Sequence, residues 1–154
     1  MRHPYETCCH GPQCEVSYAH ECLASLIDPW EKKEWSGVYR IFSPNTIIDR
    51  SCGKDPTGTL YLGLAGSGRK NWSILRNRIN SIVKQKHHVF NHYQASELVR
   101  QKFPWTSLSV EWAFTGKILD HKGDPEAEAI RAEGFLLNSY NDSFGEYPPW
   151  NIRV

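Results

Sequence analysis

The helical pattern between residues 125 and 140 places a glutamate on the apolar face of the helix that it predicts. Asp124 is suited to cap this helix, and Pro125 is suited to its first turn. At about 100° per residue, Glu133 lies at the centre of an apolar stripe. The stripe consists of Ala129, Ile130, Leu136, Leu137 and Tyr140. A carboxylate that faces a core is costly unless it is paired, protonated or bound to a cation. Glu133 is therefore a candidate functional residue, and the alternative is a buried glutamate that an arginine satisfies.

The size and composition of the chain indicate a single globular domain. It has 154 residues, of which 40% are hydrophobic and 23% charged. No apolar run approaches the roughly 18 residues that a membrane span needs. The first thirty residues also lack the apolar segment of a secretory signal. We therefore expect an intracellular (cytoplasmic) protein without a membrane partner.

Most of the cysteines are crowded near the N-terminus, where two histidines accompany them. The residues concerned are Cys8, Cys9, Cys14, Cys22, His10 and His20. Their irregular spacing fits neither a disulfide framework nor the paired spacing that is typical of zinc ligands. We do not expect zinc there, and reduced thiols in a loosely ordered extension are the interpretation that we favour.

Positive charge is concentrated in the middle of the chain. Residues 69–102 hold eight Lys and Arg against a single Glu, whereas residues 1–68 have a net charge of −2 and residues 103–154 of −4. A basic segment of this kind could attract a polyanion such as a nucleic acid. The candidate nucleic-acid-binding residues are Arg69, Lys70, Arg76, Lys84 and Lys86. The alternative is a solvated helix whose charge faces acidic helices elsewhere in the fold.

Hydrophobic periodicity predicts three strands and three helices. The strands are expected at residues 37–42, 59–65 and 107–115, and the helices at 72–86, 94–102 and 125–140. Residues 1–36 are expected to form a helical or irregular N-terminal extension, with a short helix over 21–27, and residues 43–58 a long connection. The order of the elements predicts an α/β fold, in which a compact, three-stranded, mainly antiparallel sheet is flanked by helices.

Five short motifs resemble, in order, those of the GIY-YIG nuclease superfamily. They are Gly37-Val38-Tyr39, Tyr61-Leu62-Gly63, Leu75-Arg76-Asn77-Arg78-Ile79, the segment from Glu133 to Tyr140, and Pro148-Pro149-Trp150-Asn151. Together they span residues 37–151, so the resemblance covers most of the chain and indicates a nuclease domain over residues 37–154. Helical geometry and the resemblance lead independently to Glu133.

The resemblance implies metal-dependent cleavage of nucleic-acid phosphodiester bonds. It assigns catalytic roles to Tyr39, Tyr61, Arg78, Glu133 and Asn151. Glu133 would bind Mg²⁺, with Mn²⁺ as a substitute, and Arg78 would contact the scissile phosphate. Tyr39 would help to activate the attacking water, Tyr61 would lie near the phosphate, and Asn151 would order the site or close the tail.

Other interpretations of these residues stay open. Tyr39 and Tyr61 could simply pack the sheet. Periodicity alone does not distinguish Arg78 from Arg76, so that only the resemblance selects Arg78.

The chain departs from the family pattern at several positions. Many relatives have a His or Tyr one helical turn after the arginine, where this chain has Ile82, and many have Lys where it has Leu64. His87, His88 and His92 are candidates to replace the missing histidine. The stretch between the two tyrosines is also long, and its Arg50 and Lys54 could contact DNA.

The leading hypothesis is a stand-alone, Mg²⁺-dependent DNA endonuclease of the restriction type or of the phage or mobile-element type. Its expected partner is double-stranded DNA, and a homodimer is a further candidate because no second DNA-binding domain is evident. One alternative is a repair or recombination nuclease that depends on another subunit. Another is a nucleic-acid-binding module that keeps the fold without cleavage, which Ile82 favours and the otherwise intact motif set disfavours.

Overall fold

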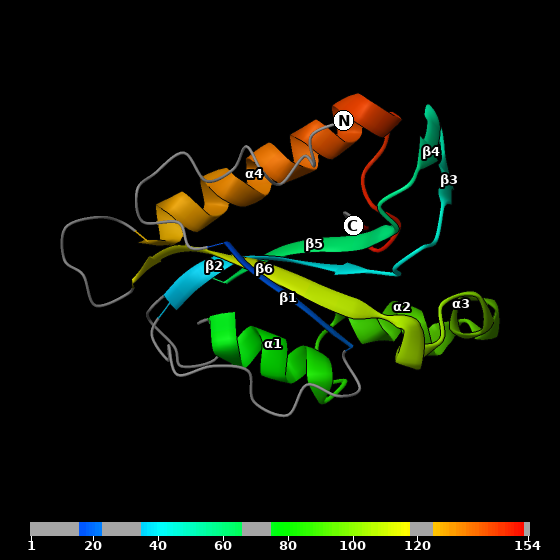
Figure 1. The fold of residues 1–154 in the computed structure, drawn as a ribbon, viewed down its shortest axis with the longest axis horizontal. Helices are drawn as coiled ribbons and strands as arrows, with labels where there is room; N and C mark the ends of the chain where they lie inside the picture. The colour runs from blue at the N-terminus through cyan, green and yellow to red at the C-terminus, as the bar shows by residue number, and fades with distance from the viewer. Residues whose placement is uncertain (1–15, 23–34, 66–74, 118–124, 153–154) are drawn as a thin grey trace.

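The computed structural model of the chain describes residues 16–22, 35–65, 75–117 and 125–152. In chain order, the elements are β1 (Val16–Cys22), β2 (Trp35–Phe42), β3 (Ile48–Arg50), β4 (Gly53–Asp55), β5 (Thr59–Ala65), α1 (Leu75–Val83), α2 (Val89–Ala95), α3 (Glu97–Lys102), the 3-10 helix η2 (Trp105–Ser107), β6 (Ser109–Lys117) and α4 (Pro125–Phe144). Helix α4 covers one face of the main sheet, and α1 and α2 lie on the other (Figure 1). The predicted α/β class, with an antiparallel sheet between helices, is confirmed.

The main sheet has four strands in the order β1-β6-β2-β5, and every neighbouring pair is antiparallel. The three predicted strands form the β6-β2-β5 part. The prediction of a helical or irregular extension is wrong over residues 16–22, because β1 pairs with β6 from Val16 opposite Ala113 to Cys22 opposite Ser109. Strand pairing depends on such partners more than on local preference. Of the short helix expected at 21–27, the first two positions belong to β1, and the others lie outside the described residues.

The helical region after α1 is divided differently from the prediction. Instead of one helix over residues 94–102, α2 and α3 follow each other with a break at Ser96. The backbone of Ser96 is extended, and its hydroxyl accepts a hydrogen bond of 3.3 Å from the N–H of Val99, so that it caps α3. The third predicted strand starts at Ser109 rather than at residue 107, because residues 105–107 form η2. Among the helices that the structure describes, none is both long enough and apolar enough to cross a bilayer.

Two clusters of buried side chains lie on opposite faces of the sheet. Along β2, Tyr39 faces α1 and α2 whereas Val38 faces α4, because successive strand residues point to opposite faces. On the α1 side, Trp112 and Trp150 are buried, and Trp105 packs against the same cluster as a partly buried side chain.

The apolar stripe of α4 is narrower than predicted. Ala129, Leu136, Leu137 and Tyr140 are buried, but Ile130 is 51% exposed. Ile130 lies about 100° around the helix from Ala129, and this places it outside the face that packs on the sheet.

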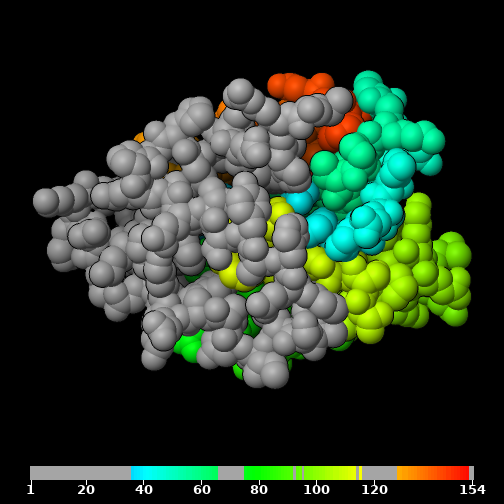
Figure 2. Space-filling model, in the orientation of Figure 1, coloured from blue at the N-terminus to red at the C-terminus, as the bar shows by residue number. Residues whose placement is uncertain are grey.

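The long connection between β2 and β5 contains the β3-β4 hairpin, which is visible at one end of the molecule (Figure 2). The hairpin is attached to the end of α4, where the N–H of Cys52 donates a 2.9 Å hydrogen bond to the carbonyl of Phe144. Arg50 forms an ion pair of 3.1 Å with Glu146 and is therefore engaged within the fold rather than held out for DNA. The side chain of Lys54 is 73% exposed.

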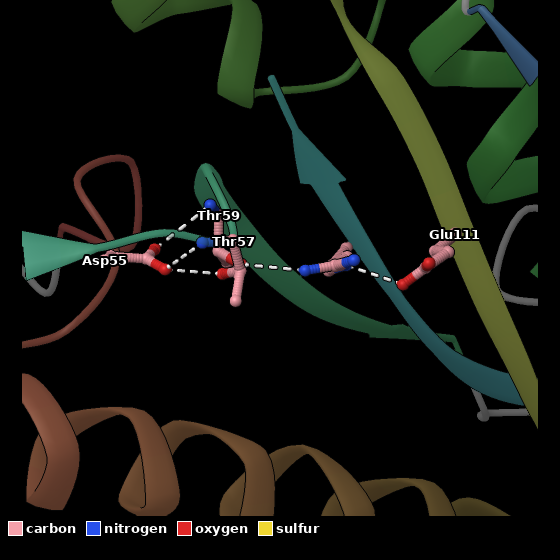
Figure 3. A network of polar contacts seen from close by, with 5 residues as sticks. Asp55, Thr57, Thr59 and Glu111 are labelled. Carbon is pink, nitrogen blue, oxygen red and sulfur yellow. Dashed lines mark hydrogen bonds and ion pairs between the residues drawn. The ribbon is translucent and has the colours of Figure 1, made fainter. Parts of the chain in front are cut away.

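A buried polar network joins this hairpin to the sheet (Figure 3) and, through Tyr140, to α4. Asp55 is fully buried and accepts hydrogen bonds from the backbone of Thr59 (3.1 Å) and from the hydroxyl of Tyr140 (2.9 Å). The network continues from the Thr59 hydroxyl to Arg40 (3.2 Å), which forms a buried ion pair with Glu111 at 2.6 Å. Satisfied buried networks of this kind rigidify a fold, so this one holds the insertion in a defined place.

We expect Tyr140→Phe to lower the free energy of unfolding by about 1–3 kcal/mol, because the buried Asp55 carboxylate loses a donor. Denaturant unfolding monitored by circular dichroism measures the change. Tyr93→Phe is the matched control, since it removes a phenol hydroxyl from the other core cluster. An equal loss in both variants would contradict the role given to the bond between Tyr140 and Asp55.

Candidate active site

Tyr39 and Tyr61 lie next to each other on the face of the sheet that α1 covers. The register of β2 and β5 pairs Tyr39 with Gly63 and Ile41 with Tyr61, so the two tyrosines are diagonal neighbours. Their ring centroids are 6.0 Å apart. A Cβ atom on Gly63 would lie 2.6 Å from the Tyr39 hydroxyl and 2.7 Å from Cε1 of Tyr61. The glycine of the second motif therefore leaves the space that both phenol rings occupy.

The glycine of the first motif also has a steric role. A Cβ atom on Gly37 would lie 2.3 Å from the carbonyl oxygen of Ala113 on β6 and 2.8 Å from Cδ2 of Leu75 on α1. The β2-β6 register shifts between Ser36 and Gly37, at the position of this close approach. Gly37 therefore lets β6 and α1 both pack closely against β2, and this closeness brings α1 to the tyrosines.

The turn after α1 directs the chain back toward the sheet. The N–H of Lys86 donates to the carbonyl of Ser81 (2.8 Å), and the N–H of Gln85 to the carbonyl of Ile82 (2.9 Å). Gln85 has a φ of 55°, in the left-handed region, and this completes a Schellman motif. As a result His87 is buried behind the turn, with 4% of its surface exposed. Ile82, one helical turn after Arg78, is fully buried in the core.

Two histidines from this turn contact the two tyrosines. Nε2 of His87 lies 2.8 Å from the Tyr39 hydroxyl, and Nε2 of the exposed His88 lies 3.2 Å from the Tyr61 hydroxyl. The two imidazole rings lie against each other with centroids 4.2 Å apart. The sequence named both residues only as candidates, together with His92, whose side chain is outside the described part. Their position depends on the turn that ends α1 at Gln85. Helical periodicity in the sequence does not predict such a turn.

Arg78 is the arginine of α1 whose charge acts on this cluster. Burial raises the pKa of Tyr39 well above its usual value, the neighbouring Tyr61 raises it further, and the charge of Arg78 opposes both. Burial also raises the pKa of Tyr61, and Arg78 again acts in the opposite direction. Periodicity did not distinguish Arg78 from Arg76, whereas this electrostatic coupling associates Arg78 with the tyrosines.

Glu133 approaches the same tyrosines from α4, on the other side of the sheet. Its side chain is half-buried, and after burial its negative charge is the second cause that raises the pKa of Tyr61. It also raises the pKa of Tyr39, as the weakest of several causes. Because β5 is an edge strand, groups from the helices on both faces can act on the residues beside it. The structure thus brings Tyr39, Tyr61, Arg78 and Glu133 into one electrostatic neighbourhood.

Asn151 fastens the C-terminal tail to β5. Its side-chain amide donates to the carbonyl of Leu62 (2.7 Å) and accepts from the N–H of the same residue (2.8 Å). The N–H of Trp150 donates to the carbonyl of Leu60 (2.8 Å). Asn151 was predicted to be catalytic, but both ends of its amide bind the backbone of Leu62, while Trp150 binds Leu60 on the other side of Tyr61. It therefore positions the strand and closes the tail.

The predicted nucleic-acid-binding residues are only partly within the described structure. Lys84 and Lys86 are exposed in the turn that leads to the two histidines, and Arg76 is half-buried on α1. Arg69 and Lys70 lie outside the described residues. Arg76, Lys84 and Lys86 therefore belong to α1 and the turn that follows it, on the side of the sheet that carries the tyrosines.

The carboxylate near the tyrosines, Glu133, suits a magnesium site that has few protein ligands. Within the described ranges, no cluster of three or more His, Cys, Asp and Glu side chains could enclose a metal ion. Mg²⁺ commonly uses one or two carboxylates together with water and substrate phosphates. Glu133 fits that mode as a single carboxylate ligand. Cys8, Cys9 and Cys14 lie outside the described residues, so that the expectation of no zinc there stays a prediction.

Comparisons with known proteins give no relative for this chain. No protein-family model, no curated protein and no solved structure matches it. The function must therefore be argued from the motifs and from the geometry of the residues themselves.

Proposed function

We propose that this protein is a Mg²⁺-dependent DNA endonuclease that hydrolyses phosphodiester bonds, similar to the GIY-YIG nucleases. The observation that carries the proposal is the convergence of four groups with complementary chemistry. Two phenols stand on adjacent strands, and both are coupled to the cation of Arg78 and to the carboxylate of Glu133. A purely structural core would not need a cation and a carboxylate beside two buried phenols, because desolvating either charged group costs free energy.

Each group has a defined task in this proposal. The guanidinium of Arg78 binds the scissile phosphate through its permanent charge and forked donors. Tyr39 is the general base: once its hydroxyl has lost its proton, the phenolate orients and deprotonates the attacking water. Tyr61 lies beside Tyr39. Glu133 would hold Mg²⁺, which when bound stabilises charge on the phosphate and on the departing 3′ oxygen. Asn151 keeps Tyr61 in place through β5.

The substrate that suits this arrangement is double-stranded DNA. Lys84 and Lys86 offer exposed positive charge close to the histidines, where the phosphate backbone could bind. A homodimer is a further part of the proposal, because a two-fold dimer can recognise two half-sites on DNA. A restriction-type or a phage or mobile-element enzyme, acting in the cytoplasm, is the variety that we favour.

Incubation with supercoiled plasmid and Mg²⁺, with and without EDTA, tests this function. We expect cleavage with Mg²⁺ or Mn²⁺ and none after chelation. Discrete fragments would indicate restriction-type specificity, and nicking or smearing a less specific nuclease. Binding without cleavage in either metal would contradict the proposal and favour a nucleic-acid-binding module. Cleavage that appears only with a cell extract would instead favour a repair nuclease that needs another subunit.

A further inference from the structure

The hydrogen bonds of His87 define which of its nitrogens carries the proton. The N–H of Val89 donates to Nδ1 of His87 at 3.3 Å, so that Nδ1 is an acceptor. Burial, followed by the charges of His88 and Arg78, lowers the pKa of His87 to about 3. The ring is therefore neutral near pH 7, and a neutral imidazole has one N–H. That N–H is on Nε2, 2.8 Å from the Tyr39 hydroxyl, and it donates to the phenol oxygen.

This direction excludes His87 as the acceptor of the Tyr39 proton. Both ring nitrogens are already engaged, one as an acceptor from Val89 and one as a donor to Tyr39. A side-chain hydrogen bond also joins the two phenols. Because the Tyr39 oxygen already accepts from His87, Tyr61 is the neighbour that can accept the proton of the Tyr39 hydroxyl. The proton of Tyr39 therefore points toward Tyr61.

The contacts continue from Tyr61 to the surface. The Tyr61 hydroxyl lies 3.2 Å from Nε2 of His88, and His88 is exposed whereas His87 is buried. His87 and His88 thus stand at the two ends of a chain of contacts that runs through Tyr39 and Tyr61. Of these two histidines, His88 is the one that is exposed to solvent. An exposed imidazole can exchange a proton with water, and a buried one cannot do so readily.

We propose that His87, Tyr39, Tyr61 and His88 form a directed hydrogen-bond chain, in which His87 is a fixed donor and the proton of Tyr39 leaves through Tyr61 to His88. The reaction role of the chain rests on the proposed nuclease function. In the transfer, the Tyr39 O–H bond breaks as a new O–H bond forms on Tyr61, whose own proton moves to Nε2 of His88. The products are a phenolate at Tyr39 and an imidazolium at His88, with no proton gained or lost. His87 is a positioning residue, because its N–H stabilises the phenolate.

Charged groups on three sides act on this chain and set its pH dependence. Arg78 on α1 favours the phenolates, Glu133 on α4 opposes them, and the imidazolium form of His88 opposes a charge on His87. His87 therefore stays neutral between about pH 5 and 8, the interval in which histidines usually titrate. Any change of the cleavage rate over that interval that depends on a histidine should be absent in His88→Gln and retained in His87→Gln.

The tautomers can be measured without any reference to cleavage. Long-range ¹H–¹⁵N spectra of the uniformly ¹⁵N-labelled full chain should show His87 with its proton on Nε2 and His88 with its proton on Nδ1. His87→Gln and His88→Gln assign the two sets of signals. We expect the His87 signals to stay unchanged from about pH 8 to pH 5. A proton on Nδ1 of neutral His87, a charged His87 at pH 7, or a proton on Nε2 of neutral His88 would overturn the chain.

The reaction role is tested by comparing two substitutions at one position. His87→Gln keeps an N–H donor for Tyr39 and should retain kcat within about tenfold, whereas His87→Ala should lose about 10²-fold or more, with the KM for DNA unchanged. Equal losses in the two folded variants would overturn the positioning role. If the wild type has the expected tautomers but cuts no DNA, the nuclease function fails while the chain stands. If it cuts DNA with other tautomers, only the chain fails.

Discussion

Glu133→Gln is expected to abolish DNA cleavage while DNA binding is largely retained. Among the described residues, Glu133 is the carboxylate whose charge acts on both Tyr39 and Tyr61, and the substitution removes that charge while keeping almost the same volume. Loss of metal-assisted charge stabilisation is worth several kcal/mol of the activation barrier, which corresponds to at least about 10³-fold in rate. This is the largest effect that we expect from any single substitution in the chain.

The matched control is Glu128→Gln, which removes an exposed carboxylate from the same helix. Plasmid cleavage with Mg²⁺ gives the rates, fluorescence anisotropy with labelled DNA gives the affinities, and circular dichroism reports the fold. A folded Glu133→Gln protein that cleaves at a rate near the wild type would remove Glu133 from the site. An equal loss in Glu128→Gln would indicate a general effect of charge on α4 rather than a metal ligand.

Arg78→Ala is expected to reduce kcat by about 10³-fold, the effect of removing a preorganised cation from a phosphoryl-group transition state. Arg78→Lys should restore only part of the rate, because an ammonium keeps the charge but loses the planar, forked geometry. The KM for DNA should change less than kcat, since the contact with the scissile phosphate is strongest in the transition state.

Arg76→Ala provides the comparison, because Arg76 lies two positions away on the same short helix. We expect it to weaken DNA binding and to reduce the dependence of affinity on salt, with kcat nearly unchanged. Cleavage rates at saturating DNA, together with affinities at several salt concentrations, separate the two effects. If Arg76→Ala is inactive and Arg78→Ala is active, the assignment of the two arginines must be reversed.

Local pattern alone determined the central elements of this protein. Strand β5 lies at residues 59–65, where the segment rich in Leu and Tyr predicted it, and α4 begins at the predicted Pro125. Such elements depend on the period of their own hydrophobic residues, which neighbouring residues already contain. The position of Glu133 on the face of α4 that packs on the sheet follows from the same period, four residues after Ala129 and four before Leu137.

Only the tertiary structure decided how the ends of elements and distant segments meet. Strand β1 exists because β6 offers an edge, and Asn151 reaches Leu62 because the tail runs along β5. Neither partner is visible in local sequence, because strand pairing is a long-range interaction.

The histidines show the same limit within the candidate site. Helical spacing from Arg78 pointed to Ile82, which is core, whereas a left-handed residue at Gln85 ends α1 and brings His87 to Tyr39. A glutamine rarely adopts that conformation by its own preference, so the turn is stabilised by its backbone hydrogen bonds and by the burial of the residues that follow it. Sequence therefore determined the central strands, α4 and the charges that they carry, and packing decided which histidine contacts which tyrosine.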